Sequence, residues 1–425
     1  MNLWTRTGDG QVTLDLHTGQ ARAWQSDKRF VFVIAGTQGG KTSFGPWYLW
    51  REIQRCGQGD YLAVTASYDL FKLKMLPELK TVFENLLGVG RYWAGDKVME
   101  LKDPETGEFW AQRSTDPMWG RIILRSAQSG GGLESATAKA AWLDECGQDD
   151  FTLEDWEAVQ RRLSLSEGRV LGTTTPYNLG WLKQEIYDPW ENGADDIDVV
   201  SFASIINPAF PKREFNRVKA RMQGWRFGMF YEGRFTKPAG LIYDCFTGDM
   251  LCDEFEIPTD WTRYIGVDFG GANTAILWAA ESPDDGKVYI YDEWLGGNLT
   301  SAEYAAIGKS KIPDECEWYC WGGAKSEGQF RRDWDVDGFG VDEPAVDGVE
   351  EGIDRGTQLI KDDRLRVFRS LRGFRDEIGS YKRKLDDAGN PLEEIEHKRR
   401  FHRMDAYRYM SVGIIEQSGP WAYIL

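Results

Sequence analysis

Apolar residues in this chain gather in short runs of strand length, and several runs end directly in glycine or in polar residues. Runs of this length, bounded by glycine, proline and polar residues, are typical of buried β-strands. The clearest of them cover residues 29–35, 60–66, 121–125, 140–143, 169–172, 264–271, 274–278, 288–294 and 318–321. The pattern predicts an α/β protein whose candidate chemistry lies at the ends of strands.

The chain has 425 residues, more than one hydrophobic core usually organises, so two domains are expected. Residues 216–231 have the pattern of a helix, and proline and glycine cluster just after it at 233–240. We therefore predict a first domain over 1–235, a linker over 236–260 and a second domain over 261–425.

The run at 29–35 leads directly into a glycine-rich segment, which is the pattern of a strand that feeds a phosphate-binding loop. Glycines let backbone N–H groups point at phosphates, Lys41 supplies a positive charge, and the Thr42 hydroxyl is placed to bind Mg²⁺. Ala35 stands where the G-x4-G-K-[ST] motif has its first glycine. The predicted nucleotide-binding residues of this loop are Gly36, Gln38, Gly39, Gly40, Lys41, Thr42 and Ser43.

Two carboxylates follow the run at 140–143, as expected of a Walker B strand. Asp144 is predicted to hold Mg²⁺ through water opposite Thr42, and Glu145 to orient and deprotonate the attacking water. An isolated acidic strand end is often only a surface feature. The phosphate loop upstream, in the order that an ASCE-type ATPase requires, favours the catalytic interpretation.

A third strand at 169–172 ends in the hydroxyls of Thr173, Thr174 and Thr175. Ligands of open α/β sheets bind at the carboxyl ends of strands, so Thr174 is predicted to sense the γ-phosphate. The alternative is that threonine simply suits a strand.

The second domain opens with Asp268 inside an apolar run next to glycines. A buried carboxylate is costly unless a positive charge meets it, and a metal ion is the natural partner. The run at 288–294 is predicted to be a neighbouring strand of the same sheet.

A formal net charge of −17 argues against a protein that coats nucleic acid with its whole surface, so any DNA contact must be local. The six cysteines include one C-x3-C pair without a second pair at zinc-site spacing, which favours buried thiols. No apolar run is long enough to span a bilayer, and residues 1–11 lack the pattern of a secretory signal. A cytosolic protein is expected.

The order of phosphate loop, apolar run with Asp144-Glu145, and G-T-T-T-P at 172–176 resembles the ATPase domain of tailed-phage terminase large subunits. The resemblance implies a P-loop (ASCE-type) domain with a mixed, mostly parallel sheet, and a linker subdomain over about 195–235. It also makes Gln20 the adenine-proximal glutamine and residues 60–66 the second strand, near the adenine.

Members of this family supply an arginine to the γ-phosphate from the phosphate loop or from a neighbouring subunit. Thr37 and Gln38 occupy the usual position in the loop, so an arginine from the loop itself is absent. Arg125 and Arg121, on the strand before the glycines at 130–132, are the candidates. They are equally well explained as strand-edge arginines.

The second domain resembles the family's RNase H-like α/β nuclease, in which an aspartate of the central strand is the first metal ligand. Asp268 matches that position. The segment from His402 to Tyr409 resembles the family's H-x-x-D-A-x-R-Y helix, which makes Asp405 the last ligand. A turn at 387–391 predicts a hairpin beside the active site, with flanking basic residues that face a phosphate backbone.

The middle nuclease ligand departs from the family pattern. An aspartate is expected just after the strand at 318–321, where this chain has Gly322 and Gly323. Glu327 is the nearest replacement and the predicted third ligand, although a glutamate favoured at a helix start is the alternative. Asp342 and Asp347 are fallbacks.

The resemblance implies a viral terminase large subunit that uses ATP and Mg²⁺ to drive double-stranded DNA into a procapsid and Mg²⁺ or Mn²⁺ to cut the concatemer. The implied partners are viral DNA, the portal protein, the small terminase subunit and the procapsid. The chain is expected to be free of membranes in the host cytoplasm, monomeric when free and a homo-oligomeric ring, a pentamer, when assembled.

Three alternatives stay open. A P-loop DNA translocase or helicase with an appended nuclease would need further helicase motifs, and residues 178–261 show none. A terminase with an incomplete nuclease site would match the missing aspartate. A scaffold with decayed sites is disfavoured because Lys41, Thr42, Asp144 and Glu145 are all present.

Overall fold

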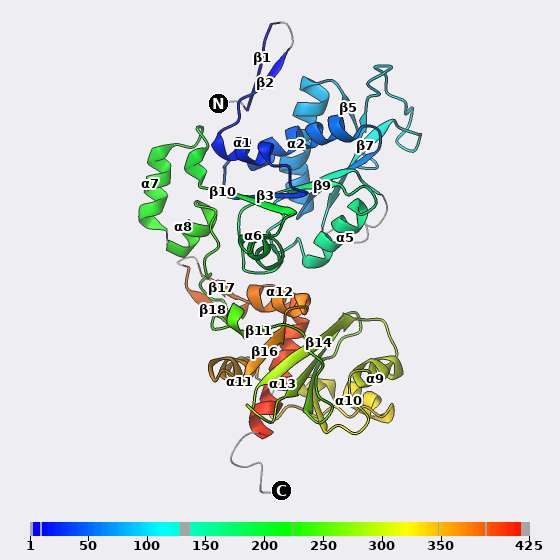
Figure 1. Ribbon diagram of the computed structural model, residues 1–425, viewed down its shortest axis with the longest axis vertical. Helices are drawn as coiled ribbons and strands as arrows, with labels where there is room; N and C mark the ends of the chain where they lie inside the picture. The colour runs from blue at the N-terminus through cyan, green and yellow to red at the C-terminus, as the bar shows by residue number, and fades with distance from the viewer. Residues whose placement is uncertain are drawn as a thin grey trace. The chain divides into compact units, whose positions relative to one another are not determined.

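The computed structural model describes residues 3–8, 11–127, 137–222, 224–346, 348–386 and 389–417. The chain forms two compact units, Met1–Pro238 and Ala239–Leu425 (Figure 1). Residues 239–260, which the sequence analysis assigns to a linker, are part of the second unit. Tyr243 is buried in its core, and a short strand at Leu251–Cys252 pairs with its sheet. Each unit is built on its own sheet.

The sheet of the first unit has eight strands in the order β10-β3-β9-β8-β4-β7-β6-β5. The first six are parallel to one another, and β6 and β5 add an antiparallel edge. Their bounds are β10 Ile197–Phe202, β3 Phe30–Ala35, β9 Arg169–Thr174, β8 Ala140–Asp144, β4 Asp60–Thr65, β7 Gly120–Ser126, β6 Val98–Leu101 and β5 Gly90–Trp93. The predicted mixed, mostly parallel sheet is therefore confirmed. Strand β9 lies between β3, which leads into the glycine-rich loop, and β8, which ends in Asp144, as predicted for an ASCE-type domain.

Helices cover both faces of this sheet. On one face α2 (Lys41–Cys56) packs against β8, where Gly45 lets the helix approach so closely that a Cβ there would lie 1.9 Å from Trp142. On the other face α5 (Leu153–Leu163) buries Trp156 against Phe30 and Phe32 of β3. The strands are apolar at consecutive positions because both faces are buried.

The remaining elements of the first unit surround this core. A hairpin of β1 (Trp4–Arg6) and β2 (Val12–Leu14) precedes α1 (Thr18–Gln25). Helical turns follow one another from Tyr68 to Leu86 as α3 (Tyr68–Leu70), η1 (Phe71–Met75), α4 (Leu76–Leu79) and η2 (Lys80–Leu86). Later segments are η3 (Leu182–Tyr187), α6 (Asp188–Glu191) and η4 (Ser204–Ile206).

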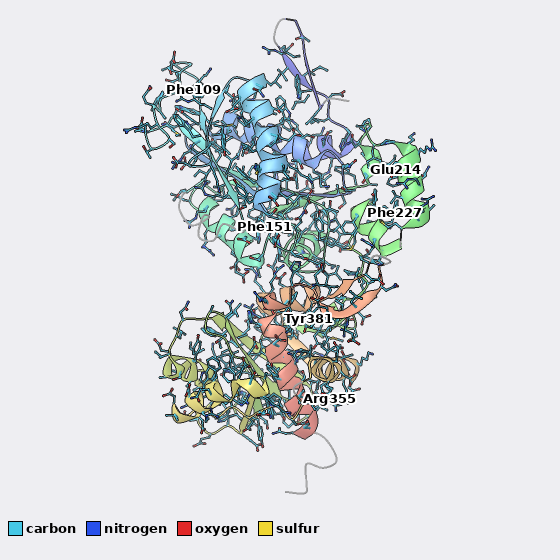
Figure 2. All side chains as sticks on the ribbon, turned by 180° about the vertical axis from the view of Figure 1, so that it is seen from behind. Phe109, Phe151, Glu214, Phe227, Arg355 and Tyr381 are labelled. Carbon is cyan, nitrogen blue, oxygen red and sulfur yellow. The ribbon has the colours of Figure 1, made fainter. Side chains whose placement is uncertain are left out.

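A small aromatic cluster holds the last two helices of the first unit, α7 (Lys212–Arg221) and α8 (Gly224–Phe230). Phe215 and Phe227 meet edge to face with ring centroids 5.1 Å apart, and Phe210 completes the cluster. Glu214 and Phe227 are labelled on these helices in Figure 2. This cluster is separate from the cores on the sheet, so residues 207–231 form a small subdomain of their own.

The sheet of the second unit has six strands in the order β11-β16-β14-β13-β12-β15. Strands β12, β13 and β14 form an antiparallel meander, while β15 is parallel to β12 and β16 is parallel to β14 and β11. The bounds are β11 Leu251–Cys252, β16 Leu365–Phe368, β14 Val288–Gly296, β13 Thr274–Glu281, β12 Thr262–Asp268 and β15 Trp318–Gly322. The predicted mixed α/β class is confirmed, whereas the Asp268 strand β12 is not central: it lies second from the edge, between β13 and β15.

Alternate residues of these strands enter two different cores. The first core contains α11 (Val349–Lys361), α12 (Arg372–Ser380) and α13 (His402–Gln417), and the second contains α9 (Ser301–Lys309) and α10 (Gly328–Val336). Gly266 of β12 brings α13 close, since a Cβ there would lie 2.3 Å from the Ala406 carbonyl oxygen. Helix α13 therefore begins directly over the carboxyl end of β12, where His402 contacts Asp268.

The predicted hairpin before α13 is present as β17 (Arg383–Leu385) and β18 (Pro391–Ile395), which pair antiparallel. Asp387 and Ala388 of the predicted turn lie outside the described residues. Short 3-10 turns complete the unit as η5 (Gly248–Met250), η6 (Lys325–Glu327) and η7 (Lys398–Arg400).

Candidate nucleotide and metal sites

The glycine-rich loop lies between the carboxyl end of β3 and the first turn of α2, as predicted. Gly40 immediately before the helix has a φ of 79°, which glycine adopts without steric cost. Two backbone N–H groups fix the loop, since Gly36 donates to Phe202 of β10 at 2.9 Å and Thr37 donates to Phe230 of α8 at 2.7 Å. The loop is thereby joined to the small subdomain.

Lys41 is folded back over this loop. Its Nζ donates to the carbonyl oxygens of Ala35 (2.9 Å) and Gly36 (2.8 Å) and to Thr175 Oγ1 (3.0 Å). Burial lowers the pKa of Lys41. Of the three predicted hydroxyls, Thr175 therefore contacts the loop lysine, whereas Thr174 Oγ1 accepts from the Gly147 N–H at 2.9 Å. Thr174 thus contacts the segment after Glu145.

Asp144 lies opposite Thr42, as the sequence predicts. Its Oδ1 accepts from Thr42 Oγ1 at 3.3 Å and from Thr173 Oγ1 at 2.8 Å. Its Oδ2 is buried and has no hydrogen-bond partner among the described residues. Burial, with Glu145 next to it, raises the pKa of Asp144 to about 7. A divalent cation beside Thr42 would satisfy the orphaned oxygen and favour the ionised carboxylate, so these residues fit Mg²⁺.

Glu145 sits at the strand end in a left-handed conformation with a φ of 54°, which is unusual for a residue with a side chain. Such conformations cost about 1–3 kcal/mol and often occur at functional sites. Tyr177 donates its hydroxyl to Glu145 Oε2 at 3.1 Å and accepts from Gln148 Nε2 at 3.3 Å. Neither Tyr177 nor Gln148 belongs to a motif, so the sequence alone does not identify them.

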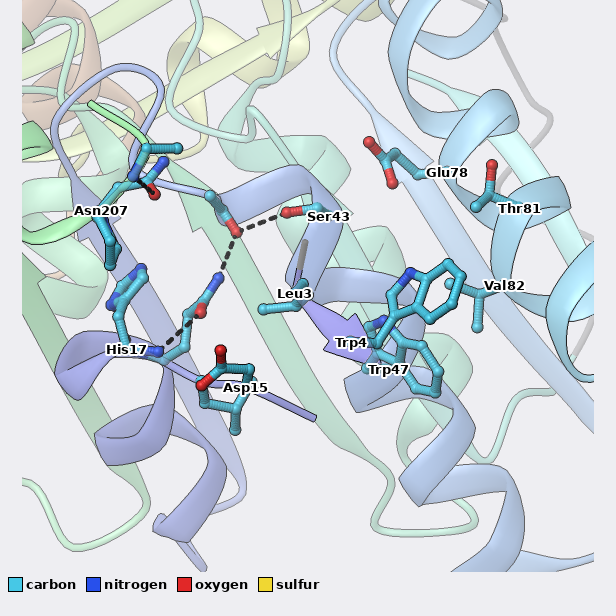
Figure 3. Close-up of a pocket in the computed structure, with 15 residues that line it drawn as sticks. Leu3, Trp4, Asp15, His17, Ser43, Trp47, Glu78, Thr81, Val82 and Asn207 are labelled. Atoms are coloured by element: carbon cyan, nitrogen blue, oxygen red, sulfur yellow. Dashed lines mark hydrogen bonds between the residues drawn. The ribbon is translucent and has the colours of Figure 1, made fainter. Parts of the chain in front are cut away.

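The cleft beside the loop has two adjoining compartments. The phosphate compartment, about 430 Å³, is lined by residues 37–43 together with Leu73, Lys74, Pro77, Glu78, Glu145 and Asn207. The base compartment, about 450 Å³, lies next to it and is lined by Trp4, Trp47, Asp15, His17 and Gln20 among others (Figure 3). Together they form a cleft with a polar end at the loop and an aromatic end beyond it.

Gln20, the predicted adenine-proximal residue, lines the base compartment. Its Nε2 donates to the Gly40 carbonyl at 2.9 Å, and its Oε1 accepts from the His17 N–H at 3.3 Å. The His17 ring contacts the Gly39 carbonyl at 3.0 Å, and Asn207 Nδ2 donates to the Gln38 carbonyl at 2.7 Å. His17 and Asn207 support the loop, yet no spacing in the sequence marks them.

The two arginine candidates lie at different ends of β7. Arg121 forms an ion pair with Asp60 at 2.9 Å, at the amino ends of the parallel strands and so on the edge opposite to the phosphate loop. Arg125 lies nearer the carboxyl end, where its guanidinium donates to the carbonyls of Asp96 (3.2 Å) and Leu124 (2.8 Å). Neither side chain lines the nucleotide cleft of its own chain.

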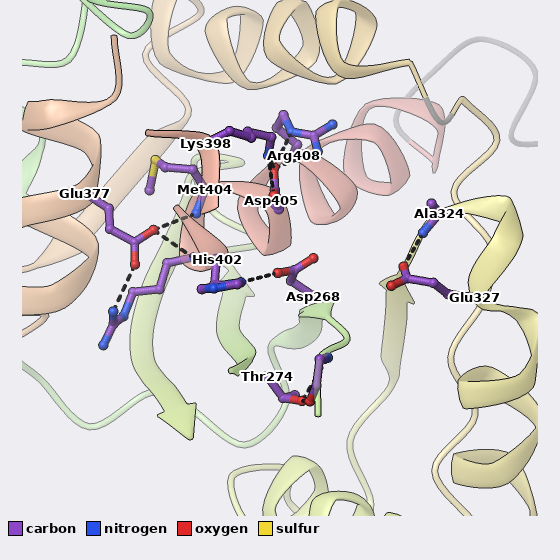
Figure 4. Close-up of polar contacts among 12 residues, drawn as sticks. Asp268, Thr274, Ala324, Glu327, Glu377, Lys398, His402, Met404, Asp405 and Arg408 are labelled. Atoms are coloured by element: carbon purple, nitrogen blue, oxygen red, sulfur yellow. Dashed lines mark hydrogen bonds and ion pairs between the residues drawn. The ribbon is translucent and has the colours of Figure 1, made fainter. Parts of the chain in front are cut away.

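In the second unit Asp268 and Asp405 come together, because α13 begins over the end of β12 (Figure 4). Asp268 Oδ2 lies 2.8 Å from His402 Nδ1. Burial, opposed by the contact with His402 and assisted by the charge of Asp405, raises the pKa of Asp268 to about 6. Lys398 donates to both oxygens of Asp405, and Arg408 donates to Oδ1 at 2.7 Å.

The residues at this site fit one cation better than two. Asp268 and Asp405 supply carboxylate oxygens, and burial makes an added positive charge favourable. Among the described residues, however, no group of three or more acidic, histidine or cysteine side chains is arranged to hold a metal ion. His402, the first residue of the predicted motif, and Lys398, one of the basic residues beside the hairpin, already contact the two carboxylates.

Glu327 lies on the turn η6 after β15, and its Oε2 accepts from the Ala324 N–H at 2.7 Å. That contact is the helix-start role named as the alternative. Its charge nevertheless reaches the candidate site: burial raises the pKa of Tyr409 most, and the charges of Asp405, Asp268 and Glu327 each raise it as well. Of the fallbacks, Asp342 is exposed and extends the sheet beside Trp321, and Asp347 lies outside the described residues.

Gly323, where the family pattern has an aspartate, is not simply a missing side chain. Its φ is 74°, and a Cβ there would lie 2.6 Å from the Phe269 ring. An aspartate would therefore need both a strained backbone and a shift of Phe269. The local backbone has adapted to glycine.

If Glu327 is the third metal ligand, Glu327→Gln should lower metal-stimulated DNA cleavage at least about tenfold, because the variant loses the charge that a ligand needs. The amide oxygen of glutamine still accepts from the Ala324 N–H, so the turn is retained. Cleavage of plasmid DNA is measured beside the ATPase rate, which should not change. Full cleavage by Glu327→Gln, together with a loss in Glu327→Ala, would show that Glu327 only caps the turn.

The basic residues of the hairpin are mostly paired with acids. Lys382 pairs with Glu396, Arg383 with Glu350 and Lys384 with Glu394. Arg399 and Arg400 of η7 have no ion-pair partner among the described residues. Arg399 and Arg400 of η7 could therefore contact a DNA backbone without breaking an existing ion pair.

No protein-family model and no curated protein sequence matches this chain. Among solved structures, the large terminase of a thermophilic bacteriophage is 15% identical, with a TM-score of 0.46, covering 94% of this chain and 99% of that chain. The ATPase domain of the large terminase of Thermus phage P74-26 is 18% identical, with a TM-score of 0.44 and coverages of 52% and 95%. The Mn-bound nuclease domain of the large terminase of bacteriophage SPP1 is 17% identical, with a TM-score of 0.31 and coverages of 40% and 98%.

Proposed function

We propose that this chain is a viral terminase large subunit, in which the first unit hydrolyses ATP to move double-stranded DNA and the second cuts it with a metal ion. The observation that carries the proposal is the contact of Thr42 with Asp144, whose second oxygen is buried and has no partner in the described part of the chain. It joins the phosphate loop to the Walker B strand around a place for one cation. Steady-state ATPase and plasmid-digestion assays with added Mn²⁺ test the two activities separately.

In the ATPase site each side chain has a role that follows from its position. Bound Mg²⁺ would neutralise phosphate charge next to Thr42 and Asp144. Lys41 would exchange its contacts with the Ala35 and Gly36 carbonyls for phosphate oxygens. Glu145, oriented by Tyr177, would hold the attacking water and accept its proton.

The contacts of the loop offer a route from hydrolysis to movement. Thr37 is hydrogen-bonded to Phe230 and Ser204, and Gln38 is hydrogen-bonded to Asn207. These three partners lie near or within the small subdomain of α7 and α8. Thr175 contacts Lys41 while Thr174 contacts the segment after Glu145. A change at the γ-phosphate would therefore alter contacts with both the subdomain and the Walker B strand, which is what a motor requires.

In the second unit, Asp268 and Asp405 would hold a catalytic Mg²⁺ or Mn²⁺, and His402 would orient Asp268. Arg399 and Arg400 would contact the phosphate backbone of DNA. A terminase with a weak nuclease is the second candidate, favoured by the lack of a third converging carboxylate among the described residues. ATP hydrolysis without metal-stimulated cleavage would identify that case.

The proposed partners are the viral DNA, the portal protein, the small terminase subunit and the procapsid, with ring assembly on the procapsid. The proposed setting is the host cytoplasm. In the part of the chain that the structure describes, no helix is long and apolar enough to span a bilayer.

If a neighbouring subunit supplies the arginine, the free chain should be a slow ATPase whose specific activity rises with concentration or with added procapsids. Arg125→Ala and Arg121→Ala are expected to remove that rise. Arg217→Ala, which deletes an exposed arginine paired with Glu214 on α7, is the matched control and should retain it. A rise that survives in both β7 variants would show that the arginine lies elsewhere.

A further inference from the structure

The two compartments of the nucleotide cleft share four lining residues, namely Gly40, Ser43, Glu78 and Asn207. A nucleotide whose phosphates lie on the loop and whose base lies between Trp4 and Gln20 must pass these residues. The group that connects phosphates to base is the ribose. The shared residues are therefore the ones that a ribose would contact.

Among the three side chains of this set, that of Glu78 of α4 is the one without a hydrogen bond or ion pair within the described ranges. Ser43 Oγ already donates to the Gly40 carbonyl at 3.2 Å, and Asn207 Nδ2 already donates to the Gln38 carbonyl at 2.7 Å. The Glu78 carboxylate has no hydrogen-bond or ion-pair partner within the described ranges, although it is half-buried. Burial raises its pKa, so an added donor would favour the ionised form.

The geometry in Figure 3 agrees with this reading of the junction. Glu78 extends from its helix toward the first turn of α2, which carries Ser43, with Trp4 and Trp47 farther along the cleft. An ionised carboxylate only accepts hydrogen bonds, so it repels phosphate oxygens and matches hydroxyl donors. Pairing of a carboxylate with ribose hydroxyls is a recurrent solution in nucleotide-binding sites.

We propose that the Glu78 carboxylate accepts hydrogen bonds from the ribose hydroxyls, so that the cleft selects ribonucleoside triphosphates over their deoxy forms. This inference rests on the proposed ATPase function. It gives Glu78 a binding role, separate from the water-activating role of Glu145. In a cell that also contains deoxynucleoside triphosphates, such selection would make ATP the nucleotide that the protein binds.

The test compares the binding of ATP and of 2′,3′-dideoxyATP, both with Mg²⁺, to the full-length chain by calorimetry. Dideoxy-ATP lacks both donors, so the choice between the two hydroxyls does not affect the result. We expect the wild-type chain to bind ATP about tenfold more tightly, the range expected of a hydrogen bond to a charged acceptor. Glu78→Ala should weaken ATP binding about tenfold, leave dideoxyATP binding unchanged and thus bring the ratio close to one.

Two further variants separate this role from a structural one. Glu78→Gln keeps an acceptor oxygen and should restore part of the discrimination. Asp69→Ala removes an exposed carboxylate from the same run of helical turns and should leave the ratio at its wild-type value. If Glu78→Ala instead disrupted the fold, the binding of both nucleotides would weaken equally and the melting temperature would fall.

The inference is overturned if the wild-type chain binds both nucleotides equally, or if Glu78→Ala keeps the wild-type ratio. It is also overturned if Asp15→Asn, in the base compartment, abolishes the discrimination while Glu78→Ala does not. Turnover is measured on the same samples. Selective binding of ATP without hydrolysis would contradict the proposed ATPase function but support the role of Glu78. Hydrolysis of ATP without selectivity for the ribose would support the ATPase function but contradict the role of Glu78.

Discussion

Glu145→Gln is expected to lower steady-state ATP hydrolysis by about two to four orders of magnitude, the usual contribution of a positioned general base. The amide keeps the size of the side chain and an oxygen that can still accept from Tyr177, but it cannot take a proton from water. Because Glu145 adds no packing that glutamine would lose, the melting temperature should stay close to that of the parent.

Lys41→Ala should abolish turnover for a different reason. Lys41 is the cation nearest the loop carbonyls, and its loss removes the charge that would meet the phosphates. Nucleotide binding should fall with it, whereas Glu145→Gln should still bind ATP. A calorimetric titration of both variants beside the ATPase assay separates the two effects.

The matched control is Glu154→Gln, the same chemical change at an exposed position in the first turn of α5. It should hydrolyse ATP at the parental rate. All three variants should retain DNA cleavage, since the candidate nuclease residues belong to the other unit. Near-normal ATPase activity in Glu145→Gln would remove the Walker B assignment.

The residues of the ATPase site that could be predicted from sequence are those that directly follow a strand along the chain. The loop after β3 and the carboxylates after β8 follow their strands directly, so a local pattern is enough to find them. Tyr177, His17 and Asn207 are brought to the site by the order of the strands and by long connections. Their roles depend on contacts between distant segments, which no local pattern encodes.

The arginines of β7 show a second limit of the sequence. Arg121 and Arg125 are four residues apart on one strand, and an alternating pattern puts both on the same face. Which end of the strand lies beside the nucleotide depends on its parallel pairing with β4. That pairing sets Arg121 against Asp60 at the far edge, a contact between residues 61 positions apart.

The third nuclease ligand was the least predictable feature. The family pattern located the end of β15, but not the left-handed backbone at Gly323 or the Phe269 ring packed against it. It also did not identify Lys398, which contacts Asp405 from the turn before α13. A basic side chain that neutralises a buried carboxylate can belong to any segment that the fold packs nearby. Its position therefore depends on tertiary packing and cannot be predicted from a local sequence pattern.

Asp268→Asn is expected to abolish metal-stimulated DNA cleavage without lowering stability. Burial raises the pKa of Asp268 to about 6, above its ordinary value of 3.8, so the ionised carboxylate is less favourable in the folded chain than in the unfolded one. That penalty is fully present at neutral pH, where the group is ionised, shrinks as the pH falls below about 6 and is lost below the ordinary pKa of 3.8. A neutral amide should therefore maintain or raise the melting temperature at pH 7.

Asp405→Asn should also abolish cleavage, but at a cost in stability. Its carboxylate is paired with Arg408, whose side chain is only 4% exposed, and with Lys398. Removing the charge leaves a buried guanidinium without its counterion, which is strongly destabilising. The melting temperature of Asp405→Asn should fall below that of Asp268→Asn, and this difference checks the electrostatics of the site independently of activity.

Plasmid digestion with Mg²⁺ or Mn²⁺, ATP hydrolysis and melting temperature are measured together on both variants. Asp362→Asn, the same change at an exposed residue at the end of α11, is the control and should cut DNA at the parental rate. ATP hydrolysis should be unchanged in all three. Loss of cleavage without loss of stability in Asp268→Asn is the result expected if this carboxylate serves metal binding and not folding. Retained cleavage in that variant would refute the nuclease assignment.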